Sequence, residues 1–172
     1  MAGREAPGAR GTLRVVFPCT EIAHPLAVAA LHRHAPQAEI VDLGVEHDAY
    51  YRLLSDLWQA GESFLVVEHD IEIHGSVLPQ VAVCGGDWCV FPYYGAGTSL
   101  LEHSLGCTRF AAPLLARQPD LMAKLPVRDW RRLDCEMFPA LLTAGERRCV
   151  HRPMVDHHHI YPGRPCSCGK EH

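Results

Sequence analysis

The sequence lacks long hydrophobic runs and the glycine motifs of common nucleotide-binding folds. No apolar stretch approaches the roughly 18 residues that a membrane-spanning helix requires. The apolar stretch at residues 13–18 is short and contains Arg14, so we expect no signal peptide. Neither Gly-x-Gly-x-x-Gly nor Gly-x4-Gly-Lys-Ser/Thr occurs, so neither a dinucleotide fingerprint nor a phosphate loop is supported.

A surplus of basic side chains and a paired cysteine framework are also missing. The formal net charge of −4 argues against general nucleic-acid binding, which normally requires a basic face. Without a secretory signal, the eight cysteines fit reduced thiols in a cytoplasmic protein. We interpret several of them as small buried hydrophobes, namely Cys19, Cys107, Cys135 and Cys149.

What is present suits a single globular domain. A length of 172 residues is enough for a sizeable core, and 48% hydrophobic residues is an ordinary content for such a domain. We expect a mobile leader at residues 1–11, a folded domain at 12–160 and a Cys/His-containing tail at 161–172.

The first 70 residues alternate between strand and helix patterns. We predict strands at residues 13–17, 39–43 and 64–68. Between them we predict a helix capped by Thr20 and stopped by Pro36, and a second that follows Asp48 and ends at Gly61. This order favours a parallel sheet with right-handed crossovers.

The pattern changes after Asp70. We expect a helix at 76–83, strands at 88–94, 103–107 and 149–151, and a helix at 133–143 that Pro139 bends or interrupts. A further helix is predicted to be capped by Thr108 and to pass through Phe110. The fold class is therefore α/β, with a mostly parallel sheet and an added antiparallel part.

Two carboxylates follow the buried strand at 64–68. Glu68 and Asp70 lie at its carboxyl end, where open α/β sheets bind ligands. Oxygen ligands on rigid backbone can hold a divalent cation. The alternative is a strand that simply ends in solvent with polar residues at its tip.

A histidine cluster lies far away along the chain. In an extended segment, His157 and His159 point the same way, so both can reach one ion. Together with Glu68 and Asp70 they would form a mixed oxygen and nitrogen site suited to Mn²⁺ or Mg²⁺ and able to hold Zn²⁺. Such an ion would neutralise a diphosphate leaving group. Alone, the cluster could equally be an exposed polar loop.

At this point the sequence resembles a known family. It is similar to the small glycosyltransferase-like proteins of the GT-A fold, particularly the compact ones from actinobacteria and their phages. The resemblance spans about residues 12–160, and the order and spacing of its segments carry it. These segments are residues 64–70, Trp88-Cys89, Pro92-Tyr93, residues 105–110, Trp130, Leu133-Asp134 and residues 155–159.

The resemblance implies a GT-A-like, Rossmann-like three-layer fold, a nucleotide-sugar donor, a divalent cation and a hydroxyl acceptor. An Asp-x-Asp motif ends a strand in that family, and Glu68 replaces its first Asp here. Asp70 would bind the metal with His157 or His159, and Glu68 would contact the donor. Pro18 and Thr20 would lie near the donor base. The family's catalytic acidic residue would fall on Asp134, with Asp129 the less favoured choice.

Individual residues allow simpler interpretations. Asp134 could act as a general base, but a carboxylate favoured by a helix dipole is slightly preferred for it. Arg109 could pair with a donor phosphate at a helix N-terminus, although an exposed first-turn residue is the simpler interpretation. Trp130 could stack on a sugar, and burial in the core is the preferred interpretation.

The tail offers an alternative function. Cys166 and Cys168 resemble the start of a SEC-C type zinc motif, with His172 as a third candidate ligand. Zinc normally requires four ligands, so residues 157–159 or another chain would have to complete the site. The second hypothesis is therefore a non-enzymatic zinc- or nucleotide-binding module, and the third is an interaction protein with a degenerate transferase fold.

Overall fold

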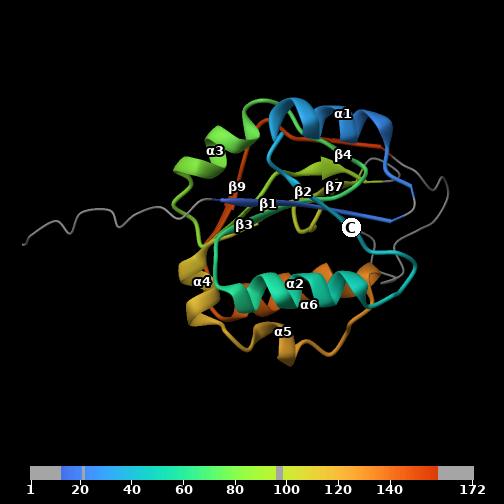
Figure 1. The fold of residues 1–172 in the computed structure, drawn as a ribbon. Coiled ribbons are helices and arrows are strands. Elements are labelled where there is room, and N and C mark those ends of the chain that lie inside the picture. The colour runs from blue at the N-terminus through green and yellow to red at the C-terminus, as the bar shows by residue number, and fades with distance from the viewer. Residues whose placement is uncertain (1–12, 21, 96–98, 159–172) are drawn as a thin grey trace, which may run out of the picture.

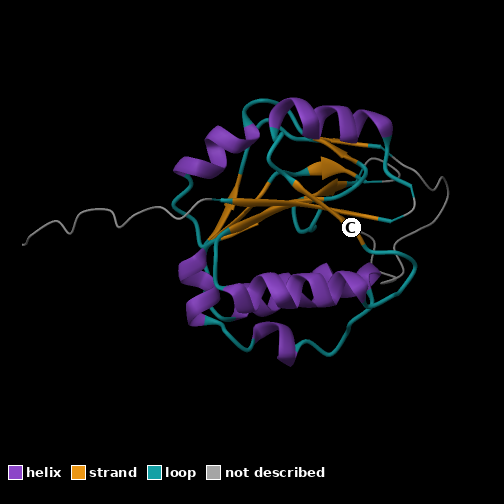
Figure 2. Ribbon diagram, in the orientation of Figure 1, coloured by secondary structure: helices purple, strands orange, loops and turns teal. Residues whose placement is uncertain are grey.

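The computed structural model describes residues 13–20, 22–95 and 99–158. A twisted sheet lies between two helical layers (Figures 1 and 2). One face is covered by α1 (Pro25–His34) and α3 (Val77–Val83). The other is covered by α2 (Ala49–Ala60), α4 (Ala112–Arg117), α5 (Leu121–Lys124) and α6 (Leu133–Thr143). The three-layer prediction is confirmed.

Five strands of the central sheet run in one direction. Within the described residues it has six strands in the order β2-β1-β3-β8-β5-β9. β1 pairs in parallel with β2 and β3, β5 pairs in parallel with β9, and β8 is antiparallel to both of its neighbours. The mostly parallel α/β sheet with an antiparallel part is thus confirmed. Its strands are β1 (Arg14–Cys19), β2 (Glu39–Asp42), β3 (Phe64–Val67), β5 (Trp88–Val90), β8 (Cys107–Phe110) and β9 (Arg148–Val150).

The elements of the first half follow the predicted order. α2 ends at Gly61, whose φ of +70° is a conformation that side chains with a Cβ rarely adopt. The predicted capping role of Thr20 is wrong. Pro25 occupies the first turn of α1, its N-cap residue is His24 without a capping side-chain hydrogen bond, and the Thr20 hydroxyl is buried without a partner among the described residues.

The predicted helix at Thr108 is also wrong. Residues 107–110 form β8 between β3 and β5, and helix α4 begins only at Ala112, with Pro113 in its first turn. The Thr108 hydroxyl donates to the Ser104 carbonyl at 2.8 Å and is fully buried. The side chains of residues 107–110 therefore alternate between two buried faces, which is a strand pattern.

The remaining differences are in short elements. The strand predicted at 88–94 is divided, because β6 (Tyr93–Tyr94) leaves the sheet and pairs with β7 (Leu100–Leu101). No strand forms at 103–106, and β9 lies one residue earlier than predicted. α6 continues across Pro139 after a 3-10 turn, η1 (Trp130–Arg132). β4 (Ile71–Glu72) pairs antiparallel with β10 (Asp156–His157).

Strand alternation divides the core into two clusters. Side chains such as Val16, Val66 and Phe110 pack toward α2 and α6. Their neighbours along the strands, such as Phe17 and Leu65, pack toward α1 and α3. The central strands β3 and β5 are therefore apolar on both faces, which explains their continuous hydrophobic runs.

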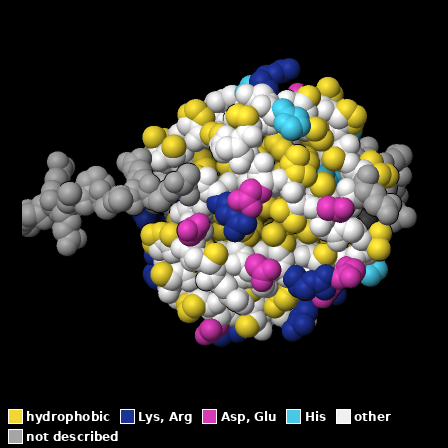
Figure 3. Space-filling view, viewed as in Figure 1, with side chains coloured by type: hydrophobic (Ala, Val, Ile, Leu, Met, Phe, Trp, Pro, Cys, Tyr) yellow, Lys and Arg dark blue, Asp and Glu magenta, His cyan; other side chains and the backbone are white. Residues whose placement is uncertain are grey.

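The surface is chemically mixed. On the face seen in Figure 3, hydrophobic side chains lie beside acidic and basic ones, and the basic groups do not form a continuous area. Within the described segments, no helix is long and apolar enough to cross a membrane.

A carboxylate network joins the turns before β5 and β9. The Glu146 side chain is only 6% exposed and pairs with Arg117, while the Gln118 amide donates to it at 3.0 Å. Arg117 also reaches Asp87 at 2.8 Å. The hydrogen bond from Arg117 holds the pKa of Glu146 below its ordinary value despite burial. Ionised Glu146 therefore stabilises the fold.

We expect Glu146→Gln to lower the melting temperature by a few degrees at pH 7. Because the pKa of Glu146 is depressed by folding, its contribution is present above the unfolded pKa and is lost as the pH falls through the folded pKa. The difference between the melting temperatures of wild type and variant should therefore shrink as the pH falls from 7 to 3. Asp120→Asn, in an exposed pair with Lys124 at 3.7 Å, is the matched control and should change little. An undiminished difference at pH 3 would contradict this role.

Candidate active site

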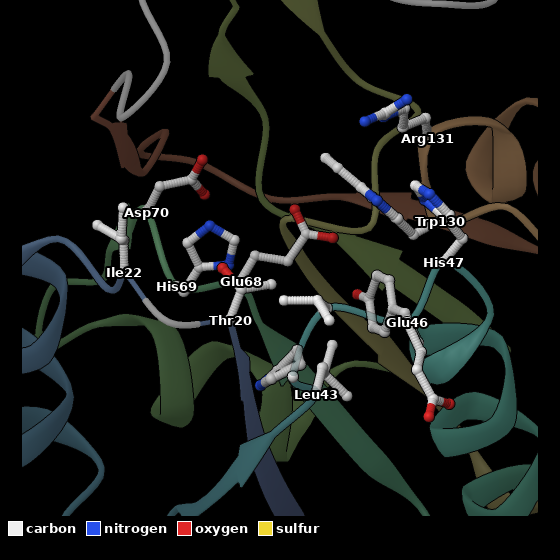
Figure 4. A pocket seen from close by; sticks show the side chains of 14 residues that line it. Thr20, Ile22, Leu43, Glu46, His47, Glu68, His69, Asp70, Trp130 and Arg131 are labelled. Carbon is white, nitrogen blue, oxygen red and sulfur yellow. The ribbon is translucent and has the colours of Figure 1, made fainter.

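A cavity opens at the carboxyl ends of β1, β2 and β3. Its volume is about 290 Å³, and Figure 4 shows the side chains that line it. Asp70 lies at one end, Trp130 and Arg131 lie at the other, and Glu68 lies between them (Figure 4). The lining residues are Pro18, Thr20, Ile22, Leu43, Gly44, Val45, Glu46, His47, Tyr50, Glu68, His69, Asp70, Trp130 and Arg131.

Glu68 is the most perturbed carboxyl group of the cavity. Burial raises its pKa to about 8, and the negative charges of Asp70 and Asp134 add to the rise. The Tyr50 hydroxyl opposes the shift, although it makes no hydrogen bond of normal geometry to any described residue. The ionised carboxylates of this cleft therefore repel one another, and this repulsion favours the binding of a cation.

Asp70 and His157 converge across 87 positions of sequence. His157 Nε2 lies 3.1 Å from Asp70 Oδ2, because β10 pairs with β4 directly after Asp70. Burial alone would raise the pKa of Asp70, but the His157 imidazole outweighs it and holds the pKa below its usual range. His157 Nδ1 lies 3.2 Å from the Tyr94 carbonyl, which can only accept, so that nitrogen carries the hydrogen.

His157 and His158 serve different partners. They lie on opposite faces of the extended segment, and His158 Nε2 approaches Glu72 Oε2 at 2.8 Å. The His158 ring also stacks on His24, with ring centroids 4.1 Å apart. These contacts hold together the two-stranded sheet of β4 and β10. His159 lies outside the described residues.

The residues that support the His157 ring are tightly packed. The Tyr93 ring contacts His157 with centroids 4.8 Å apart, and its hydroxyl is hydrogen-bonded to Ser104. A Cβ at Gly106 would stand 2.5 Å from the Tyr93 ring, so only glycine fits there. The Gly106 carbonyl in turn accepts from the Glu68 amide at 2.8 Å. Gly106 therefore couples the position of Glu68 to that of His157.

Asp134 lies in the first turn of α6 and is not among the residues that line the cavity. Its negative charge raises the pKa values of Tyr50, Glu68 and Tyr93. Its Oδ1 accepts from the Cys135 amide at 2.8 Å. Asp129 instead accepts from the Arg131 amide at 3.0 Å and so caps η1.

The interpretation of Trp130 as a core residue is wrong. Its side chain is 43% exposed and lines the cavity, with the Arg131 guanidinium 5.5 Å from the ring centroid. The Trp130 amide donates to the His47 carbonyl at 3.4 Å, which joins η1 to the loop before α2. Sequence reasoning missed Arg131, His47 and Tyr50, since they reach the cavity through this loop packing.

The predicted donor-contacting residues divide into two groups. Pro18, Thr20 and Glu68 line the cavity, whereas Arg109 does not. Arg109 belongs to strand β8, not to a helix N-terminus, and its guanidinium donates to the Gly86 carbonyl at 2.9 Å. It shares a face of the sheet with its partners Leu65 and Cys89, which pack toward α1 and α3.

Comparison with solved structures finds proteins of similar architecture. A glycosyltransferase involved in the glycosylation of the major capsid of PBCV-1 matches 84% of this chain and 94% of its own, at 11% identity and a TM-score of 0.51. The chain has a glycosyltransferase-like fold. A197 from STIV matches 87% of this chain and 86% of its own, at 12% identity and a TM-score of 0.54. No family model and no curated protein matches the sequence.

Proposed function

We propose that the protein is a metal-dependent glycosyltransferase that moves a sugar from a nucleoside-diphosphate donor to a hydroxyl acceptor. The observation that carries the proposal is the convergence of Asp70 and His157 at the strand ends, beside a cavity of about 290 Å³. The glycosyltransferase-like fold supports it, because ligands bind at this edge of open α/β sheets.

The donor set fits a divalent cation. Asp70 offers a carboxylate oxygen, and the Nδ1 contact of His157 with the Tyr94 carbonyl leaves Nε2 as the metal-binding nitrogen. One oxygen and one nitrogen ligand leave most positions of Mn²⁺ or Mg²⁺ for donor phosphates and water. When bound, the ion would neutralise the charge that develops on the departing diphosphate.

The rest of the cavity suits the nucleoside. Pro18, Leu43 and Val45 provide apolar surface against which a planar base can pack, and Trp130 adds an aromatic face at the far end. A volume of about 290 Å³ lies at the lower end of the range for small-molecule sites. Arg131 beside Trp130 supplies the cation at that end.

Asp134 is the proposed general base. Its negative charge acts on Glu68 of the cavity, and its carboxylate would accept the proton of the acceptor hydroxyl as that oxygen attacks the sugar. Glu68, which lines the cavity, would help to orient the donor. Neighbouring positive charge would favour its ionised form.

A thermal-shift screen tests the proposal. Nucleotide sugars and nucleoside diphosphates are added to the full chain with Mn²⁺, with Mg²⁺ or with a chelator. At ligand concentrations about 100 times the dissociation constant, we expect one donor class to raise the melting temperature by about 5–10 °C, and only with the metal. The absence of metal-dependent stabilisation by every nucleotide would contradict the proposal. Equal stabilisation with the chelator would refute the metal dependence.

A further inference from the structure

A second group of potential ligands lies on the opposite part of the sheet. Cys84, Cys89 and His151 place two sulfurs and an imidazole nitrogen within 4.8 Å of one another. None of the three lines the cavity described above. We propose that these side chains, together with Cys149, form a structural zinc site that ties β9 to β5 and α3.

Strand register brings the group together. Cys89 of β5 is the parallel partner of Cys149 in β9, and the His151 amide donates to the Val90 carbonyl at 2.9 Å. Because side chains alternate along strands, Cys89, Cys149 and His151 share one face of the sheet. α3 covers that face (Figure 1). The helix ends at Val83, and Cys84 directly follows its last turn.

Cys149 lies beside this group, although it is not one of the three side chains whose ligand atoms lie within 4.8 Å of one another. It is the strand partner of Cys89, and Cys84 and Cys149 pack against the same hydrophobic cluster. The four side chains provide the Cys₃His donor set of many structural zinc sites. Metal–ligand lengths of about 2.0–2.3 Å would require the ligand atoms to close to somewhat under 4 Å.

The imidazole of His151 has the properties of a metal ligand. Its Nε2 is buried and has no hydrogen-bond partner among the described residues, which is costly for a polar atom. The Phe91 ring stacks on the imidazole, with centroids 4.7 Å apart, and holds its orientation.

The charge of the site is balanced locally. Three thiolates and Zn²⁺ carry a net charge of −1, and the Arg109 guanidinium lies on the same face as Cys89. The hydrogen bond from Arg109 to the Gly86 carbonyl fixes the turn between Cys84 and Cys89. This role accounts for a half-buried arginine that does not line the donor cavity.

Metal content of matched variants tests the site. The full chain is purified with zinc, passed over a weak chelator and analysed for bound metal. We expect about one zinc per chain in the wild type, in the tail variant Cys166→Ser/Cys168→Ser and in Cys19→Ser. We expect none in Cys84→Ser/Cys149→Ser or in His151→Ala. A wild type without zinc, or zinc lost with the tail cysteines and kept without Cys84 and Cys149, would overturn the proposal.

Alkylation of the wild type covers the case in which variants do not fold. Cys19, Cys84, Cys135 and Cys149 are all partly exposed, so they form an internally controlled set. With zinc bound, Cys84 and Cys149 should react at least 10-fold more slowly than after strong chelation, while Cys19 and Cys135 should not change. Equal rates for all four cysteines with and without zinc would contradict the site.

Discussion

Asp70→Ala should lower metal-dependent hydrolysis of the sugar donor by at least about 100-fold, which corresponds to about 2.7 kcal/mol of transition-state stabilisation. The carboxylate at position 70 is the oxygen ligand of the proposed cation, and His157 alone would hold the ion weakly. Donor hydrolysis by the purified variant, measured across a range of Mn²⁺ concentrations, checks the expectation.

The fold should survive this change. The Asp70 carbonyl keeps its hydrogen bond from the His158 amide at 2.9 Å, and the substitution removes the contact of the carboxylate with His157 Nε2. Asp156→Asn is the matched control, because Asp156 is an exposed neighbour of His157 in β10. The control should retain wild-type turnover. Wild-type turnover in Asp70→Ala itself would rule out the metal role.

Asp134→Asn should reduce sugar transfer to the acceptor by about 10²- to 10⁴-fold, the usual contribution of a general base. Binding of donor and Mn²⁺ should be unchanged, since asparagine Oδ1 can still accept from the Cys135 amide. The loss should therefore appear in kcat and leave the donor KM within about 2-fold.

Asp129→Asn separates the two candidate bases. Asparagine can replace Asp129 as the cap of η1, so this variant should fold and transfer normally. If Asp129→Asn loses transfer and Asp134→Asn does not, the base has been assigned to the wrong residue. A reduction below about 10-fold in both variants would indicate that neither carboxylate is the base.

The parallel half of the fold could be predicted from local pattern. Strands β1, β2 and β3 are short apolar runs between amphipathic segments, and consecutive elements of this kind are neighbours in space. β8 could not be predicted in this way. Its place between β3 and β5 depends on pairing with distant strands, and Thr108 followed by Phe110 also fits a helix start.

Proximity of the site residues was harder to predict. Glu68 and Asp70 could be identified because they end a buried strand, whereas Pro18 and Thr20 follow only from the resemblance to the GT-A family. The contact of His157 with Asp70 depends on the small two-stranded sheet of β4 and β10, which has no local sequence signal. The orientation of Trp130 also depends on packing, since an aromatic residue before a helix fits a core and a cavity wall equally well.

The cysteines show a further limit of local reasoning. The sequence pattern that suggested a zinc site is that of Cys166 and Cys168, which are close together in the chain and lie outside the described residues. The group around Cys84 is assembled from a helix end and two strands, with Cys149 65 positions later in the sequence. Only strand register brings Cys89 and Cys149 side by side.

The most direct test of the account is the position of manganese in crystals grown with Mn²⁺ and a nucleoside diphosphate. Anomalous scattering locates the ion independently of the refined protein coordinates. The account predicts a peak about 2.0–2.4 Å from an Asp70 oxygen and from His157 Nε2, with the diphosphate completing its coordination in the cavity. A diphosphate bound elsewhere, or an ion that contacts neither Asp70 nor His157, would contradict it.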